Sequence, residues 1–192
     1  AEAVEKAGLA FIGPQSDVIR LMGDKIHSRE FAEKAGVPVA PSVTQEGSLE
    51  TFVEQATKIG FPLLIKAAAG GGGKGMSIVR EAGELAERVQ VATGEAERYF
   101  ADGRVYAERY IDRPRHIEVQ VMGDGEGNVV HLFERECSVQ RRFQKIIEES
   151  PAASLPTELR DRICEAARAL AASASYRNAG TVEFILAPDG EF

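Results

Sequence analysis

Glycines and lysines concentrate in one short segment of the 192-residue chain. Glycine lacks a Cβ atom, so successive backbone N–H groups of a glycine-rich loop can approach an anion closely. Lysine ammonium groups add positive charge beside such a loop. The segment is therefore predicted to close over the phosphates of a nucleotide. Its candidate ligand residues are Lys66, Gly70, Gly71, Gly72, Gly73, Lys74, Gly75 and Met76.

Two common phosphate-binding patterns do not describe this loop. A Walker A loop ends in Gly-Lys-Ser/Thr and leads into a helix, and the dinucleotide fingerprint also opens a helix. Residues 76–79 instead have the composition of a strand. The alternative is a flexible linker, but a linker seldom lies between two apolar strands with flanking lysines.

A second group of polar residues lies in two neighbouring segments. Residues 116–122 alternate, so His116, Glu118 and Gln120 share one face of a predicted strand. Residues 134–145 combine several Glu, Arg, Gln and Lys side chains, a composition that suits a site for several anions. A solvated edge of a sheet has the same composition, so the residue types alone leave both alternatives open.

Glu183 lies in a predicted strand over residues 181–186, where a carboxylate can hold a Mg²⁺ ion that bridges nucleotide phosphates. Such a metal usually takes two carboxylates, and the second is expected beyond residue 192. Cys137 has acidic neighbours that would raise the pKa of its thiol, which disfavours a role as nucleophile.

Charge and apolar content limit the class of protein. Thirty acidic against 23 basic side chains give a net charge of −7, which argues against a nucleic-acid-binding protein. No apolar run approaches the roughly 18 residues of a membrane helix, so no membrane span is expected. Two cysteines without metal-ligand spacing favour a reducing compartment such as the cytoplasm.

Helices are predicted where apolar residues recur every three or four positions. Asp24 is expected to cap a helix that ends at Gly36, and Ser48 is expected to cap the next helix. Longer helices are expected over residues 81–100 and 156–172. The predicted inward stripe of the first of these consists of Leu85, Ala86, Val89 and Ala96.

Strands are predicted from apolar runs and from alternation of apolar and polar residues. They cover residues 61–65, 76–79, 105–111, 116–122, 128–134 and 181–186. Turn residues 124–127 join two of them into a hairpin. Antiparallel hairpins with segregated helices indicate an α+β fold rather than a doubly wound parallel sheet.

The two ends of the sequence suggest a piece of a longer polypeptide. Residues 1–8 have the pattern of the last turns of a helix. Residues 187–190 have turn chemistry after a strand, and only two residues follow them. We therefore expect further chain on both sides.

Several motifs spread along nearly the whole chain support a family resemblance. They are Gly13-Pro14, Leu21-Met22-Gly23-Asp24-Lys25, Ala35-Gly36-Val37-Pro38, Ile65-Lys66-Ala67 with the four glycines, Pro114-Arg115-His116-Ile117-Glu118-Val119-Gln120, Glu134-Arg135-Glu136-Cys137-Ser138-Val139-Gln140-Arg141-Arg142 with Gln144-Lys145, and Gly180-Thr181-Val182-Glu183-Phe184. Together they resemble biotin carboxylase of the ATP-grasp superfamily. The resemblance implies an incomplete α+β ATP-grasp fold, with a lid subdomain over residues 40–111. Its body would cover residues 1–39 and 112–192 and be truncated at the C-terminus.

The resemblance also implies a reaction. In the biotin carboxylase component of an acyl-CoA or pyruvate carboxylase, MgATP and bicarbonate form carboxyphosphate, and CO₂ is then transferred to N1 of biotin. The implied ligands are ATP, Mg²⁺ or Mn²⁺, bicarbonate and biotin on a carrier domain. The implied partners are the biotin carboxyl carrier domain and a carboxyltransferase subunit or domain. Dimerisation is common in the family. The expected location is the cytoplasm, with the mitochondrial matrix as the alternative in a eukaryote.

The family pattern assigns nucleotide contacts to particular residues. Lys25 and Lys66 match residues that contact the ATP phosphates, and the glycine loop lies on a mobile lid. Glu108, Arg109 and Ile111 match the segment that receives the adenine, to which Arg109 contributes backbone groups.

The same pattern assigns residues around the reacting groups. His116 matches a histidine of the nucleotide site, and Glu183 matches the first of two metal-binding glutamates. Gln140 and Lys145 match residues near the carboxyphosphate, where Lys145 would offset developing negative charge. Phe143 is a departure, because the family usually has a nucleotide-contacting histidine at that position.

Other functions stay open beside this one. The family's amino-terminal Rossmann-like domain and its bicarbonate-binding residues lie outside the sequence, so the isolated chain is expected at most to bind nucleotide. Another ATP-grasp carboxylate-amine ligase or a carbamoyl-phosphate synthetase-like enzyme shares the lysine and acidic positions, although residues 140–145 favour biotin carboxylation. A nucleotide-binding module without chemistry of its own is the third alternative.

Overall fold

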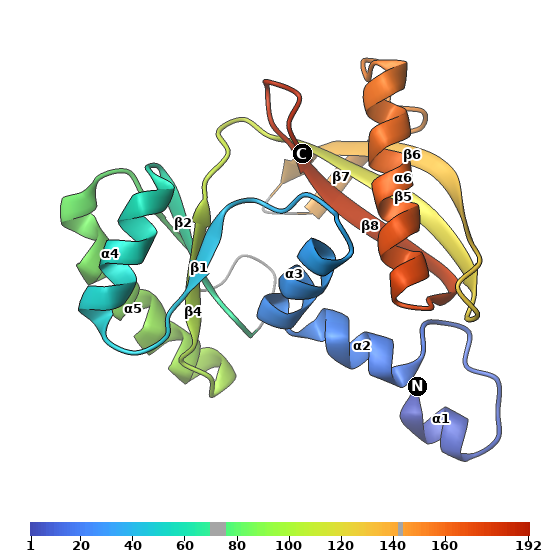
Figure 1. The fold of residues 1–192 in the computed structure, drawn as a ribbon, viewed down its shortest axis with the longest axis horizontal. Coiled ribbons are helices and arrows are strands. Elements are labelled where there is room, and N and C mark those ends of the chain that lie inside the picture. Colours follow the sequence, from blue (N-terminus) through green and yellow to red (C-terminus); the bar gives the residue numbers. More distant parts are fainter. Residues whose placement is uncertain (70–75, 142–143) are drawn as a thin grey trace. The chain divides into compact units, whose positions relative to one another are not determined.

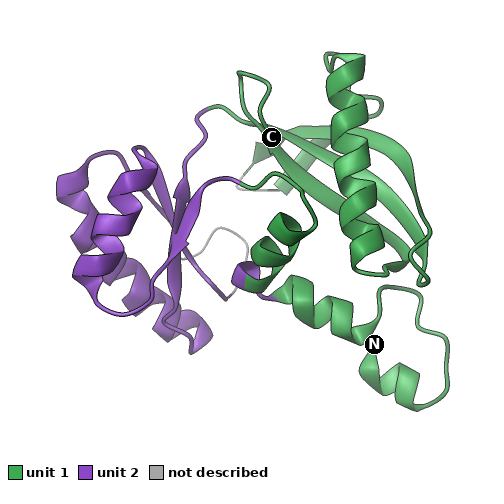
Figure 2. Cartoon of the chain, in the orientation of Figure 1, with its two compact units in different colours: residues 1–23, 27–39, 113–192 green, residues 24–26, 40–112 purple. Residues whose placement is uncertain are grey.

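The computed structural model describes residues 1–69, 76–141 and 144–192. The chain forms two compact units (Figure 2): unit 1 comprises residues 1–23, 27–39 and 113–192, and unit 2 comprises residues 24–26 and 40–112. Each unit contains one four-stranded sheet, and every strand pair in both sheets is antiparallel. The sequence predictions for Gly70, Gly71, Gly72, Gly73, Lys74, Gly75 and Phe143 lie outside the described residues.

Unit 2 packs two helices on one face of its sheet. The strand order is β1 (Ser42–Thr44), β4 (Val105–Arg109), β2 (Leu63–Ala67) and β3 (Met76–Val79). Helices α4 (Leu49–Ile59) and α5 (Ala82–Phe100) bury Phe52, Leu85 and Val89 against Leu63 and Ile65. Because side chains alternate along β2, the intervening Leu64 and Lys66 lie on the face away from these helices.

Unit 1 has one long helix on its sheet. The strand order is β7 (Gln144–Glu149), β6 (Val129–Arg141), β5 (Arg115–Asp124) and β8 (Arg177–Leu186). Helix α6 (Thr157–Ser173) crosses this sheet (Figure 1) and buries Ile163 and Ala167 against Ile117, Val119 and Phe184. Three shorter helices precede the sheet in sequence: α1 (Glu2–Lys6), α2 (Ser16–Gly23) and α3 (Lys25–Lys34), whose first two residues belong to unit 2.

Local capping chemistry explains several helix ends. The Asp24 carboxylate accepts a hydrogen bond from the backbone of Ile26 at 2.9 Å, and Gly36 adopts φ +74° just after α3. The Ser48 hydroxyl accepts from the backbone of Thr51 at the start of α4. The predicted caps and the predicted glycine stop are therefore confirmed.

Several predicted details are wrong. Ala86 is exposed, and Ala92 completes the buried stripe of α5 in its place. The strand expected over residues 61–65 begins at Leu63, since Pro62 has no N–H for the ladder. The strand expected over residues 128–134 continues to Arg141 as β6, because β7 supplies a partner for its second half.

The structure also bears on the membrane prediction. Within residues 1–69, 76–141 and 144–192, no helix combines the length and the apolar character needed to cross a bilayer.

Candidate functional site

The polar side chains of β5 lie on the sheet face opposite α6. Ile117, Val119 and Val121 are buried in the core under α6, so alternation directs His116 and Glu118 to the other face. This confirms the predicted division of the strand into two faces. The polar face, and not the apolar one, is thus where unit 1 can meet a ligand.

Two glutamates occupy directly opposed positions on this face. Glu118 of β5 is paired in register with Glu183 of β8. Like charges in opposed positions destabilise a sheet. Lys145 of β7 relieves this repulsion, because its ammonium group contacts Glu118 Oε2 and lies 2.7 Å from Glu183 Oε1. Burial favours the neutral amine of Lys145, but these two carboxylates outweigh it and hold its pKa well above the ordinary range.

Glu118 is an ionised carboxylate in a nearly closed environment, with only 3% of the residue exposed. Burial by itself raises the pKa of Glu118, but the hydrogen bonds from Lys145 and Arg135 outweigh burial and lower it. Arg135 is the register partner of Glu118 on β6, and its Nε lies 2.6 Å from Glu118 Oε1. The buried charge is therefore balanced by a cation on either side.

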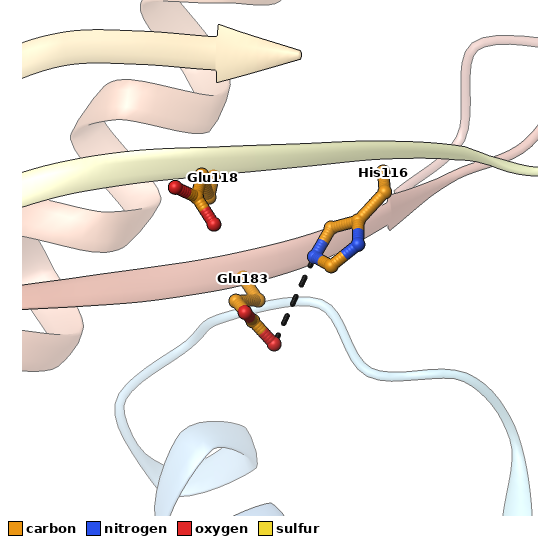
Figure 3. A group of neighbouring side chains, drawn as sticks. All are labelled: His116, Glu118 and Glu183. Atoms are coloured by element: carbon orange, nitrogen blue, oxygen red, sulfur yellow. Dashed lines mark ion pairs between the residues drawn. The ribbon is translucent and has the colours of Figure 1, made fainter. Parts of the chain in front are cut away.

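His116 and Gln140 extend the same face. Gln140 Nε2 donates to the carbonyl of Cys137 at 2.8 Å and lies 2.7 Å from His116 Nδ1. With the amide nitrogen in this position, Nδ1 is an acceptor, so a neutral His116 carries its proton on Nε2. That nitrogen points towards Glu183 Oε2 at 3.7 Å, as the dashed line in Figure 3 shows.

His116, Glu118 and Glu183 also form a possible metal-binding group. One ligand atom from each of the three lies within 4.8 Å of the others (Figure 3). Carboxylate oxygens are the ligands preferred by Mg²⁺ and suit Mn²⁺, so the exposed Glu183 fits a divalent cation. Both oxygens of Glu118 are already engaged, one by Lys145 and one by Arg135.

A second acidic group, formed by Glu118, Cys137 and Glu148, fits a metal less well. Burial, together with Glu118, raises the pKa of the Cys137 thiol to about 11. A protonated thiol is neither a metal ligand nor a nucleophile, and the predicted direction of this pKa shift is confirmed.

Unit 2 gathers its own cationic group on the sheet face away from its helices. Lys66 Nζ lies 2.5 Å from Glu108 Oε1. Burial and the neighbouring Lys66 ammonium lower the pKa of Lys25, and Glu108 opposes them. Lys25, Lys66 and Glu108 are thus brought together. Two ammonium groups that repel each other are well suited to a polyphosphate, which relieves the repulsion.

The segment expected to receive adenine is anchored by backbone hydrogen bonds. The Arg109 N–H donates to the carbonyl of Pro41 at 2.9 Å, and the next N–H, of Tyr110, donates to Pro62 at 3.0 Å. The Arg109 side chain reaches the carbonyl of Ile59 at 3.2 Å. Since its N–H is engaged, the backbone group that Arg109 can offer a ligand is its carbonyl. Ile111 follows two residues later, outside the strand.

The predicted site residues thus fall into two sets. Lys25, Lys66, Met76, Glu108, Arg109 and Ile111 belong to unit 2, whereas His116, Gln140, Lys145 and Glu183 belong to unit 1. The sequence analysis includes Glu118 and Arg135 in its second polar group but assigns neither of them a role in the site. The usable signal is present in the alternation of β5, because Glu118 shares the face of His116, but the partner strands are needed to reveal the charge pairs.

Comparison with known proteins gives a consistent result. The family model described as the carbamoyl-phosphate synthase L chain, ATP binding domain, matches residues 24–192. The chain is 54% identical over 190 residues to a pyruvate carboxylase of Bacillus subtilis, covering 97% of the chain and 16% of that protein. It is 47% identical to a biotin carboxylase of Nostoc sp., covering the whole chain and 43% of that protein.

Solved structures agree in fold. A biotin carboxylase from Campylobacter jejuni, in complex with β,γ-ATP, superposes with a TM-score of 0.90 at 45% identity, covering the whole chain and 43% of that protein. The biotin carboxylase domain of a 2-oxoglutarate carboxylase from Hydrogenobacter thermophilus, a dimer crystallised with MgADP, ADP and bicarbonate, gives 0.90 at 43% identity, with the whole chain and 42% of that protein covered. The expected α+β ATP-grasp fold is confirmed, and the chain spans less than half the length of these relatives.

Proposed function

Because the chain belongs to the family of the carbamoyl-phosphate synthase L chain ATP-binding domain, we propose that it contributes part of the ATP site of a biotin carboxylase. In the proposed reaction, MgATP and bicarbonate form carboxyphosphate and ADP, and CO₂ is then transferred to N1 of biotin on a carrier domain. The activity is assigned to a longer enzyme, since the chain spans 16% of the pyruvate carboxylase and 43% of the biotin carboxylase that it resembles.

One observation carries the proposal: Lys145 is held between two carboxylates on the polar face that also presents His116 and Gln140. A fixed ammonium in this position can offset the negative charge that develops when bicarbonate attacks a phosphoryl group. Gln140 adds an amide donor, and it also orients the imidazole of His116 towards Glu183. Lys145 is thus assigned to charge stabilisation and Gln140 to binding and orientation.

The residues of unit 2 are assigned to the nucleotide. Lys25 and Lys66 bind phosphate oxygens, with Glu108 keeping Lys66 in place. Arg109 offers its carbonyl to the edge of the adenine, and Ile111 belongs to the same adenine-receiving segment. We assign residues 40–111, with Met76 and the glycine segment before it, to a lid over the phosphates.

Glu183, whose side chain is exposed, would provide one carboxylate ligand for the divalent cation, Mg²⁺ or Mn²⁺. When bound, such an ion supplies positive charge that neutralises nucleotide phosphates. Lys145 must then share Glu183 with the ion, and its contact with Glu118 gives it a second anchor.

The partners follow from the proposed reaction. Bicarbonate is a substrate, a biotin carboxyl carrier domain presents the biotin, and a carboxyltransferase subunit or domain receives the carboxyl group. A homodimer is proposed by analogy with the Hydrogenobacter domain, which is described as a dimer. Similar proteins include bacterial enzymes and a mitochondrial methylcrotonoyl-CoA carboxylase subunit of Dictyostelium discoideum, so we assign the protein to the cytoplasm of a bacterium or to the mitochondrial matrix of a eukaryote.

The test is ATP hydrolysis by the full-length protein with bicarbonate and free biotin. We expect turnover to depend on bicarbonate and to fall about 100-fold or more in Lys145→Ala, because loss of one charge-stabilising group costs that much. Lys58→Ala, which removes an exposed lysine at the end of α4, is the matched control and should leave the rate unchanged.

Two outcomes would contradict the proposal. Biotin-independent turnover that ammonia stimulates would indicate a carbamoyl-phosphate synthetase-like ligase. Undiminished turnover in both Lys66→Ala and Lys145→Ala would show that these positions serve no catalytic purpose, as in a nucleotide-binding module.

A further inference from the structure

Arg135 stands at the centre of the polar face of unit 1, yet the proposed reaction assigns it no role. It lies on β6, and its guanidinium contacts Glu118 Oε1 through Nε at 2.6 Å and through Nη2 at 2.5 Å. Its Nη1 reaches Gln120 Oε1 at 3.2 Å, and Glu148 Oε2 lies 3.6 Å from its Nε. A guanidinium can serve several acceptors at once because its donors form a rigid fork.

Glu118 connects Arg135 to Lys145. Its two carboxylate oxygens are divided between the two cations: Oε1 faces Arg135, and Oε2 faces Lys145. The side chain of Glu118 is 4% exposed, so water cannot replace either partner. The position of the Glu118 carboxylate, and through it that of Lys145, therefore depends on Arg135.

A second connection runs from Arg135 to β8. Gln120 accepts from Arg135 through Oε1 and donates through Nε2 to the carbonyl of Gly180 at 2.8 Å. Gly180 lies three residues before Glu183 on the same strand. Arg135 thus reaches β8 through Gln120, and it reaches Glu183 through Glu118 and Lys145.

We propose that Arg135 is a positioning residue for Lys145 and Glu183, acting through Glu118. This inference rests on the function proposed above. Arg135, Lys145, Glu118 and Glu183 are balanced in charge as a group. Without Arg135 the group would carry an excess negative charge, Lys145 would be drawn onto Glu118 alone, and less of its charge would be available to an anionic substrate.

The test compares Arg135→Ala, Arg135→Lys and Arg168→Ala in the full-length protein. Arg168 pairs with Glu165 on the exposed side of α6 and is the matched control. We expect kcat for bicarbonate-dependent ATP cleavage to fall about 10- to 100-fold in Arg135→Ala, as for other residues that orient a reacting group. The KM for ATP should change less than about twofold, because the phosphate-binding lysines assigned to unit 2 are untouched.

Two further variants distinguish a positioning role of Arg135 from a role in folding: a conservative replacement and a double mutant. Arg135→Lys should recover part of the rate, since an ammonium can neutralise Glu118 but cannot also reach Gln120. In a protein that already carries Glu118→Gln, adding Arg135→Ala should lower kcat much less than it does in the wild type. Thermal unfolding of each variant measures any loss of fold, and rates are compared per folded molecule.

Three results would overturn the inference: an unchanged kcat in Arg135→Ala, a fall equal to that in Arg168→Ala, or a rise in KM for ATP that accounts for the whole effect. Each leaves the proposed function intact provided that Lys145→Ala still lowers turnover about 100-fold or more. Failure of the wild-type protein to hydrolyse ATP with bicarbonate would instead refute the proposed function itself.

Discussion

The main feature at the scale of single residues is a set of buried and half-buried carboxylates that stay ionised because cations lie beside them. Glu118 is balanced by Lys145 and Arg135. Glu136, two strand positions from Glu134, accepts two hydrogen bonds from Arg115, which lower its pKa against the effect of burial. Both groups bind protons more weakly in the folded than in the unfolded chain, which links folding to pH.

This linkage predicts acid sensitivity. A carboxylate whose folded pKa lies below the unfolded value of about 4.5 adds stability above that pH, and this stability is lost as the pH falls through the folded pKa. We expect the free energy of unfolding, measured with urea, to decline as the pH drops below about 4.5. The decline should be shallower in Glu118→Gln and unchanged in Glu149→Gln, an exposed control on β7. An equal slope in all three proteins would contradict the assignment.

At the scale of elements, one buried ion pair joins α6 to the sheet. Glu134 of β6 is fully buried, and its Oε1 accepts from Arg160 of α6 at 2.9 Å and from the backbone of Ala152 at 3.0 Å. The helix is therefore held to the sheet by a charge that water cannot reach, in addition to the apolar contacts of Ile163 and Ala167.

Removing the cation of this pair should be costly. Arg160→Ala leaves the Glu134 carboxylate buried with no charge partner, and we expect it to lower the free energy of unfolding by about 3–5 kcal/mol. Arg168→Ala breaks an exposed pair on the same helix and should cost about 0–1 kcal/mol. Chemical denaturation measures the free energy of unfolding of both variants. Similar losses in the two would show that the buried ion pair stabilises the fold no more than the exposed one.

Two glycines illustrate how an element depends on its neighbours. A Cβ added at Gly123 of β5 would lie 2.0 Å from the carbonyl oxygen of Tyr176, whereas one added at Gly94 of α5 would meet nothing within 4 Å. Gly123→Ala should therefore destabilise the protein by about 1–3 kcal/mol through overpacking. Gly94→Ala should stabilise it by about 0.5–1 kcal/mol, because glycine is a poor helix former. Thermal or urea unfolding would test both, and equal effects would contradict the argument.

At the scale of the whole molecule, the part of the chain that the structure describes has two hydrophobic cores. One consists of residues of unit 1 under α6, and the other of residues of unit 2 between α4, α5 and their sheet. Each core is closed by side chains of its own unit, so local damage should stay within that unit.

Hydrogen exchange of backbone amides tests this independence. Ile163→Ala removes a fully buried side chain from unit 1, and Phe52→Ala removes one from unit 2. Each substitution is expected to lower the free energy of unfolding by about 2–5 kcal/mol. Exchange should accelerate in β5 and α6 for the first variant and in β2 and α4 for the second. Faster exchange throughout the chain in both variants would show a single cooperative unit.

Much of the fold follows from the order of residues alone. The alternation of β5 separates Ile117 and Val119 from His116 and Glu118, and short-range capping identifies Asp24 and Ser48 as helix starts. These features depend on side chains a few residues apart, whose geometry is set by the backbone period. The motifs that resemble biotin carboxylase are likewise a property of the sequence, and the similarity to biotin carboxylases of Nostoc sp. and Campylobacter jejuni confirms the resemblance.

Only the tertiary structure decides which strands pair and in which register. Only the pairing of β6, β5 and β8 shows that Arg135, Glu118 and Glu183 lie side by side, and only the pairing of β7 with β6 brings Lys145 to them. Until these partners are known, the charged stretch that contains Arg135 fits a solvated edge of a sheet equally well. Packing against neighbouring elements also decides that α5 buries Ala92 and not Ala86. The physical reason is the same in each case: these contacts join residues from separate elements, whose relative placement no local pattern encodes.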